Sequence, residues 1–337
     1  MQTQQVAQPT PGQAPSLTVD RDPVRSPEGD TPRSGKNPGV EKENGQFTIH
    51  ADVEEVALNA TVLDAAGHLV QDLKQDNFQV FEDGIKQNII SFQHTDLPVS
   101  IALVVDNSGS MARKRPSVNK SAIDLVEASN PKDEAFVVNF SDEAFIDQEF
   151  TSEINKLRDG LSHIESRGGT ALYDAVVASA DKLAADAKRP KQVLVIITDG
   201  EDNASTLDLE QTIHRVQALS GPVIYSIGLL FGDEMSRSEV RHARRALEML
   251  STETGGIAFF PKSIEQVDQI AAEVARDIRS QYTIGYHSTK ASTVPGFRHV
   301  DLQAEGSAHG KLTVRTRTGY FPVTRQAKKS GQARGEQ

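Results

Sequence analysis

Three short segments of the sequence concentrate oxygen-bearing side chains of the kind that hard metal ions prefer. They are Asp106-Asn107-Ser108-Gly109-Ser110, Arg167-Gly168-Gly169-Thr170 and Asp199-Gly200-Glu201-Asp202. Carboxylate and hydroxyl oxygens suit a cation such as Mg²⁺, which takes oxygen ligands at about 2.0 to 2.1 Å and usually keeps some waters. Such oxygens could ligate a cation or cap a helix, depending on where folding places the three segments.

Each of the three segments lies where a predicted strand ends or a predicted helix begins. The apolar runs 99–105 and 193–198 predict buried strands directly before the first and third segments, and an amphipathic stretch at 171–185 follows the second. In open α/β sheets, ligands bind outside the carboxyl ends of the strands. We therefore expect the three segments to meet at one edge of a sheet.

The middle of the chain, from about residue 98 to 280, alternates short apolar runs with helical patterns. The predicted strands cover 99–105, 135–140, 192–198 and 222–229, and the predicted helices cover 117–128, 153–164, 171–185, 209–219, 239–250 and 263–278. Alternation of this kind specifies a doubly wound, mostly parallel sheet covered by helices. The fold class of this region is therefore α/β.

The flanks of this region show the period-two pattern of half-buried strands. Val56, Leu58, Ala60 and Val62 alternate with polar residues, and the same pattern recurs at 78–80, 282–286, 300–302 and 312–314. Segments 65–67 and 82–84 each end in a glycine that supplies the positive φ of a tight turn. We expect residues 45–97 and 281–322 to pair into one small antiparallel β-sandwich, with residues 98–280 inserted between its halves. Two separate β units are the alternative.

Helix capping is the simpler explanation of some of the polar residues. Asp106 and Ser108 precede a predicted helix, where such side chains commonly accept hydrogen bonds from free backbone N–H groups. Thr170 is placed to cap its helix as well. Capping does not account for Asp199 arriving on the neighbouring strand end, and one residue can fill both roles.

Taken together, the three segments resemble the metal-ion-dependent adhesion site of von Willebrand factor type A domains, the family that includes integrin I domains. The resemblance rests on an Asp-x-Ser-x-Ser motif after a buried strand, a Gly-Gly-Thr loop and a strand-terminal Thr-Asp-Gly, in that order. It implies that the metal ligands are Asp106, Ser108, Ser110, Thr170 and Asp199. It also implies Mg²⁺ as the ion, with Ca²⁺ or Mn²⁺ as alternatives, and a Glu or Asp of a protein partner that completes the coordination.

Several charged residues near these segments have two alternative roles each. Glu201 and Asp202 either extend the acidic site or lie solvated on a loop, and we favour the solvated position. Segment 113–115 is basic and either steers an acidic ligand toward the metal or forms a solvated turn. His163 offers a general base, although a histidine at a helix end more often has no catalytic role. We predict no catalytic residues and no organic cofactor.

Composition excludes several classes of protein. The chain has 337 residues and no cysteine, so it has no disulfide and no thiolate site. Its net charge of -11 disfavours nucleic-acid binding, because phosphate neutralisation needs a basic face. No stretch approaches the roughly 20 consecutive apolar residues of a membrane-spanning helix.

The two ends of the chain are rich in polar residues, proline and glycine. We expect disorder over 1–44 and 323–337, because such segments bury too little apolar surface to offset the entropy of ordering. Segment 1–17 lacks the basic start and apolar stretch of a secretory signal. The flanking strands together with the central region resemble a bacterial group of von Willebrand factor A-related proteins, often exported, which implies an extracytoplasmic (secreted or periplasmic) location.

These observations favour a metal-dependent protein-binding or adhesion module that is not an enzyme. A metal-assisted hydrolase and a structural assembly subunit are the alternatives.

Overall fold

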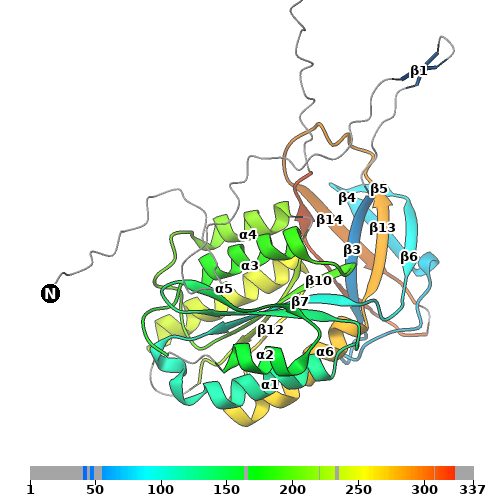
Figure 1. Cartoon of the computed structure of the whole chain (residues 1–337). Coiled ribbons are helices and arrows are strands. Elements are labelled where there is room, and N and C mark those ends of the chain that lie inside the picture. The colour runs from blue at the N-terminus through cyan, green and yellow to red at the C-terminus, as the bar shows by residue number, and fades with distance from the viewer. Residues whose placement is uncertain are drawn as a thin grey trace, which may run out of the picture.

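The structure is a computed structural model that describes residues 41–43, 46–48, 55–162, 166–219, 221–231, 235–306 and 308–322 (Figure 1). The segments predicted to be disordered lie outside the described residues over 1–40 and 323–337. Strand β1 (Glu41–Glu43) pairs antiparallel with β2 (Gln46–Thr48). No helix of the described residues is long and apolar enough to cross a membrane.

A six-stranded sheet forms the centre of the inserted region, in the order β12-β11-β10-β7-β8-β9. Its first five strands run parallel, and only the edge strand β9 is antiparallel. The strands are β7 (Val99–Asp106), β8 (Glu134–Phe140), β9 (Ala144–Thr151), β10 (Lys191–Thr198), β11 (Val223–Gly228) and β12 (Ala258–Phe259). The predicted mostly parallel sheet is confirmed.

Helices cover both faces of this sheet (Figure 1). Ile101, Leu103 and Val105 of β7 pack with α1 (Arg115–Glu127), α2 (Ile154–Leu161) and α6 (Val267–Arg279), whereas Ala102 and Val104 pack with α3 (Leu172–Asp186), α4 (Leu209–Ala218) and α5 (Arg237–Thr254). Both faces of β7 are apolar because both are covered, as expected of a central parallel strand. Short 3₁₀ turns precede α1 and α6, at η2 (Gly109–Arg113) and η3 (Ile264–Gln266).

Two four-stranded antiparallel sheets, each with strands from both flanks, form a single β-sandwich. Their orders are β15-β3-β13-β6 and β16-β14-β4-β5. The strands are β3 (Glu55–Leu63), β4 (Phe78–Glu82), β5 (Ile85–Gln87), β6 (Ile89–Gln93), β13 (Tyr282–His287), β14 (Arg298–Ala304), β15 (Thr313–Arg315) and β16 (Gly319–Tyr320), and a 3₁₀ turn, η1 (Gln75–Asn77), precedes β4. Alternate side chains of both sheets share one apolar core. The insertion of the α/β region into one sandwich is therefore confirmed, while the domain boundaries given above stay a prediction.

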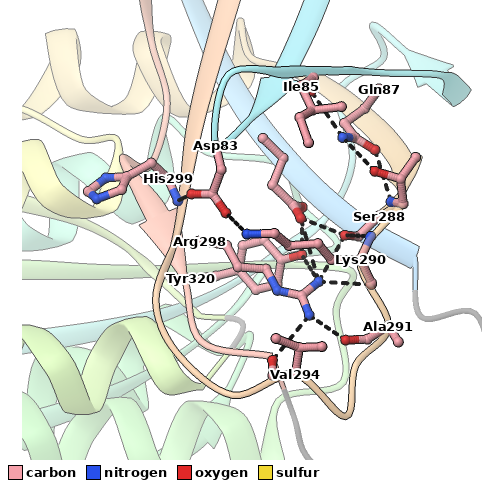
Figure 2. A network of polar contacts seen from close by, with 12 residues as sticks. Asp83, Ile85, Gln87, Ser288, Lys290, Ala291, Val294, Arg298, His299 and Tyr320 are labelled. Carbon is pink, nitrogen blue, oxygen red and sulfur yellow. Dashed lines mark hydrogen bonds and ion pairs between the residues drawn. The ribbon is translucent and has the colours of Figure 1, made fainter.

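A buried ion pair fixes one end of the sandwich (Figure 2). The side chains of Arg298 and Glu82 are 4% and 1% exposed, with 3.5 Å between Nη1 and Oε1. Glu82 also accepts hydrogen bonds from the hydroxyls of Tyr286 and Tyr320, and Arg298 donates to the carbonyl of Ala291 at 2.7 Å. Each charge is thus both paired and hydrogen-bonded, as burial requires. The network attaches the loop between β13 and β14 to the sheet.

A second buried group joins the sandwich to the α/β region. Asp277, near the end of α6, accepts hydrogen bonds from Tyr225 of β11 at 2.6 Å and from Arg315 of β15 at 2.6 Å. Because α6 is followed directly by β13, this contact lies where the chain passes from one region to the other.

Candidate metal site

The two aspartates of the candidate site end neighbouring parallel strands. Asp106 is the last residue of β7 and Asp199 follows β10, and the two strands pair with Val105 opposite Ile197. Because the two strands are parallel and in this register, both carboxylates lie at the carboxyl edge of the sheet, on its two central strands. This is the edge at which open α/β sheets bind ligands.

Asp106 is fully buried and held by two short hydrogen bonds. Its Oδ1 accepts from the backbone N–H of Ser108 at 2.8 Å, and its Oδ2 accepts from the Thr198 hydroxyl at 2.5 Å. Burial raises the pKa of Asp106 to about 6, against the opposing effect of these hydrogen bonds, and the charge of Asp199 adds to the rise. A cation at this edge would favour the charged form of Asp106.

The two serines connect the first loop to Asp199. Ser110 Oγ donates to Asp199 Oδ1 at 2.8 Å, and the hydroxyl oxygens of Ser108 and Ser110 lie 3.2 Å apart. Ser108 is buried and Ser110 is exposed. The site is therefore buried on the side that faces the strands and open to solvent at Ser110.

Thr170 reaches the same place from the loop before α3. A Cβ on Gly200, the residue after Asp199, would lie 3.2 Å from Thr170 Oγ1. The Thr170 hydroxyl itself has no hydrogen-bond partner among the residues that the structure describes. The structure thus brings the segments of all five predicted ligands together at one sheet edge.

Lys114 places a positive charge directly at this site. Its Nζ lies 2.5 Å from Asp199 Oδ2, with the lysine side chain 16% exposed and the aspartate side chain fully buried. The same ammonium lies 5.7 Å from the ring centroid of Phe231. The five predicted ligands supply only oxygen atoms, and two of the ligands are carboxylates, so the set fits a hard divalent cation. In the structure Asp199 is already paired with the ammonium group of Lys114.

Arg115, the next residue, is not placed to steer an acidic ligand toward the metal, which was one of the two roles considered for segment 113–115. It is fully buried, and it donates to the backbone carbonyl of Asp106 at 3.2 Å and to Asn139 Oδ1 at 2.8 Å. The reason is that α1 begins there and its first turn faces the sheet. Arg115 braces the strand end that carries Asp106, whereas Arg113 is exposed.

The loops around the site hold one another through side-chain contacts with backbone groups. Asp142 accepts from the N–H of Gly169 at 2.6 Å, and Asn203 accepts from the N–H of Thr170 at 2.9 Å. Gly168 has φ 80°, and a Cβ there would lie 2.1 Å from Asp142 Oδ2. Only glycine fits this position, because the conformation and the space both exclude a side chain.

Two expectations for this region were wrong. The Thr170 side chain makes no capping bond to α3. Instead Asp202 accepts from the N–H of Tyr173 at 3.0 Å and Ser205 accepts from the N–H of Asp174 at 3.1 Å. Asp202 is therefore a half-buried capping residue rather than a solvated one, supplied to the helix by a loop that is distant in sequence.

A cavity of about 240 Å³ adjoins the site. Besides the site residues it is lined by an apolar wall and by acidic groups; the wall is Leu229, Leu230, Phe231 and Met235, and the acids are Glu201, Asp202 and Glu239. Glu201 Oε1 lies 3.1 Å from Nδ1 of His242, which is exposed. The candidate base His163 lies outside the described residues.

Sequence reasoning missed three residues that shape the site. Lys114 was considered only as one member of a basic turn, and Asp142 and Asn203 were not considered. Asp142 offered a signal, since it lies just beyond the end of β8 as Asp199 does beyond β10. Asn203 offered none, because its contact with Thr170 spans 33 residues of sequence.

Parts of this chain are similar in sequence to known proteins. Residues 101–201 match the sequence profile of the von Willebrand factor type A domain. The human inter-alpha-trypsin inhibitor heavy chain H4 is 26% identical over 238 residues, covering 65% of this chain and 25% of that protein. Its Bos taurus counterpart is 21% identical over 271 residues, covering 74% of this chain and 27% of that protein. The chain thus spans about a quarter of the length of these curated relatives.

Among solved structures, a von Willebrand factor type A protein from Catenulispora acidiphila is similar over 79% of this chain and 73% of its own, with a TM-score of 0.45 and 12% identity. An aerotolerance-related membrane protein from Bacteroides fragilis is similar over 53% of this chain and 98% of its own, with a TM-score of 0.41 and 19% identity. The profile match includes β7 from Ile101 onward, the loop with Ser108 and Ser110, Thr170 and Asp199. Residues 101–201 are therefore similar in sequence to a von Willebrand factor type A domain.

Proposed function

We propose that the protein is a divalent-metal-dependent protein-binding module. Asp106, Ser108, Ser110, Thr170 and Asp199 would hold Mg²⁺, with Ca²⁺ or Mn²⁺ as alternatives. The observation that carries the proposal is the meeting of these residues at the carboxyl edge of adjacent strands, where Ser110 bonds Asp199 at 2.8 Å. A von Willebrand factor type A domain is in general a protein-interaction or adhesion module, and the metal dependence is the further step proposed here.

The charge of the site supports a cation. Asp106 and Asp199 carry two negative charges within a buried edge, and burial of a charge is costly unless it is paired. Asp199 is paired with Lys114, but Asp106 accepts only neutral donors in its side-chain hydrogen bonds. One divalent cation would balance both carboxylates if it displaced Lys114 from Asp199.

The open side of the site supports a protein ligand. A bound metal ion would supply an electrophilic position that a Glu or Asp side chain of the partner can occupy. Ser110 is exposed and borders the cavity, whose apolar wall of Leu229, Leu230 and Phe231 would contact the residues beside that carboxylate. Lys114 lies at the same rim, where its charge favours an acidic ligand.

Calorimetry with Mg²⁺ tests the metal assignment. We expect wild-type protein to bind one equivalent, and Ser110→Ala to bind at least tenfold more weakly. Because Ser110 is exposed, this change leaves the fold intact, and circular dichroism checks that it does. Ser238→Ala, which removes an exposed serine from α5, is the matched control. Equal Mg²⁺ binding by wild type and Ser110→Ala refutes the assignment.

We propose further that binding, not hydrolysis, is the role of the site. Hydrolysis would need a free base beside the metal ligands, whereas the carboxylates that line the cavity are engaged. Asp202 accepts from the N–H of Tyr173, Glu239 accepts from the N–H of Ser236, and Glu201 lies 3.1 Å from His242. Turnover of nitrophenyl phosphate or nitrophenyl acetate that requires Mg²⁺ and is lost in Ser110→Ala would contradict this. We propose that the protein is located outside the cytoplasm. Fractionation of the native cells, with an antibody that detects the protein in each fraction, would test this.

A further inference from the structure

Helix α5 exposes a face that is rich in arginine. At about 100° per residue, its four arginines fall within about 100° of arc on one side of the helix; they are Arg237, Arg241, Arg244 and Arg245, all exposed. The opposite side carries Ala243, Ala246, Leu247 and Leu250, which are buried against the sheet. The arginine face is therefore not needed for packing of the helix.

Most of these charges have no partner among the residues that the structure describes. Arg244 lies 3.6 Å from Glu248 and stacks over the ring of Phe260 at 3.8 Å. Arg237, Arg241 and Arg245 form no ion pair or side-chain hydrogen bond with another described residue. Three like charges within about two turns repel one another, and among the described residues Glu248 of the same face lies within ion-pair distance of Arg244 only. An external anionic ligand would offset this repulsion.

Helix α5 begins beside the candidate metal site. Met235 and Glu239, at the start of α5, line the cavity beside Asp199, and His242 contacts Glu201 of the loop after β10. From Arg237 to Arg245 the helix rises about 12 Å. An extended peptide covers that distance with about four residues.

We propose that the arginine face of α5 binds an acidic segment of a protein partner, four to six residues long, adjoining the carboxylate that reaches the metal. The proposal rests on the proposed function for the position of that carboxylate. The segment is acidic because it must oppose Arg237, Arg241 and Arg245. The chain as a whole has a net charge of -11, so this face is a local reversal of sign that selects where an acidic partner can approach.

Nucleic acid fits the face less well. Stable phosphate binding draws on about six to ten cationic contacts, and the net charge of -11 repels a polyanion longer than the helix. A short acidic peptide meets only the four arginines. The test therefore includes nucleic acid as a competitor.

The test uses a fluorescein-labelled peptide of twelve residues with alternating Glu and Gly, measured by anisotropy in excess chelator. The variant carries Arg237→Gln, Arg241→Gln and Arg245→Gln, which keep helix propensity. The matched control carries Lys74→Gln, Lys132→Gln and Lys311→Gln, which remove the same charge from exposed positions outside α5. At about 0.5 to 1 kcal/mol for each exposed pair, three pairs correspond to a loss of about 10- to 150-fold.

We expect the wild type and the lysine control to bind the peptide with a salt-dependent affinity, and the arginine variant to bind at least tenfold more weakly. A peptide with Gln in place of Glu should not bind. Equal binding by the arginine variant, no binding by the wild type, or stronger competition by a 20-base-pair DNA duplex than by unlabelled peptide overturns the proposal. Chelator removes the metal site from this assay, so its outcome is independent of the Mg²⁺ calorimetry.

Discussion

Replacement of Lys114 by Met should strengthen Mg²⁺ binding. Lys114 Nζ lies 2.5 Å from Asp199 Oδ2, so the ammonium and a metal ion would compete for one carboxylate. A charge-assisted hydrogen bond contributes about 1.5 to 3 kcal/mol net. At about 1.4 kcal/mol for each factor of ten, its removal should lower the Kd for Mg²⁺ by about 10- to 100-fold.

The same substitution should destabilise the metal-free protein. Without Lys114 the Asp199 side chain, which is fully buried, loses its counter-charge. We expect a lower Tm for Lys114→Met than for wild type in chelator, and a larger rise of Tm when Mg²⁺ is added, since a ligand of the folded state stabilises it by mass action. Calorimetry gives the Kd and differential scanning fluorimetry gives the two Tm values.

Arg113→Met is the control for the change in net charge. Arg113 is exposed and adjacent in sequence, so its removal should change the Kd only slightly after screening by 0.15 M salt. A Kd for Lys114→Met that equals or exceeds that of wild type, or an equal gain in Arg113→Met, would refute the competition for Asp199.

Three further predictions concern the framework. Gly168→Ala should destabilise the protein by more than Gly296→Ala in urea unfolding, although both have positive φ; strain costs each about 1 kcal/mol, and only position 168 adds a clash, at 2.1 Å with Asp142. Asp277→Ala should cost about 3 kcal/mol by urea unfolding, because it leaves buried polar partners unsatisfied, and less than 1 kcal/mol would contradict the bridging role. Burial lowers the pKa of Lys191 to about 8, so between pH 8 and 10.5 the unfolded chain binds more protons than the folded one. The free energy of unfolding should therefore rise by about 3 kcal/mol over this range, relative to Lys191→Met. Parallel pH profiles of the two proteins would exclude this.

The elements that the sequence predicted correctly are those whose signal is local. β7 and β10 are continuous apolar runs because helices cover both of their faces, and such runs stand out in any sequence. The turn at Asp83 and Gly84 has φ of 47° and 78°, as the residue types indicated. The predicted strand ends alone were enough to predict that the loops carrying Asp106 and Asp199 meet.

The parts that were missed depend on contacts between distant segments. β9 is a half-exposed edge strand, with Asp147, Gln148 and Glu149 in its middle, so neither periodicity nor apolar content predicted it. The burial of Arg115 follows from its contact with Asn139 and could not be read from the basic run around it. Asp202 caps α3 from a loop 29 residues away in sequence. For these residues the structural role depends on a contact with a distant segment of the chain and not on residue type alone.

The topology explains why the candidate site is accessible although its domain interrupts another one. The chain enters the α/β region at the amino end of β7 and leaves it at the end of α6, and both points lie at the amino edge of the sheet: Lys191, the first residue of β10, donates to the carbonyl of Ile278, and Arg279 pairs with Asp96. The sandwich is attached at this edge (Figure 1), and Asp106 and Asp199 end their strands at the opposite one. Substitutions in the Glu82–Arg298 network should therefore lower stability and leave the Kd for Mg²⁺ unchanged, because a parallel strand of eight residues separates the two edges.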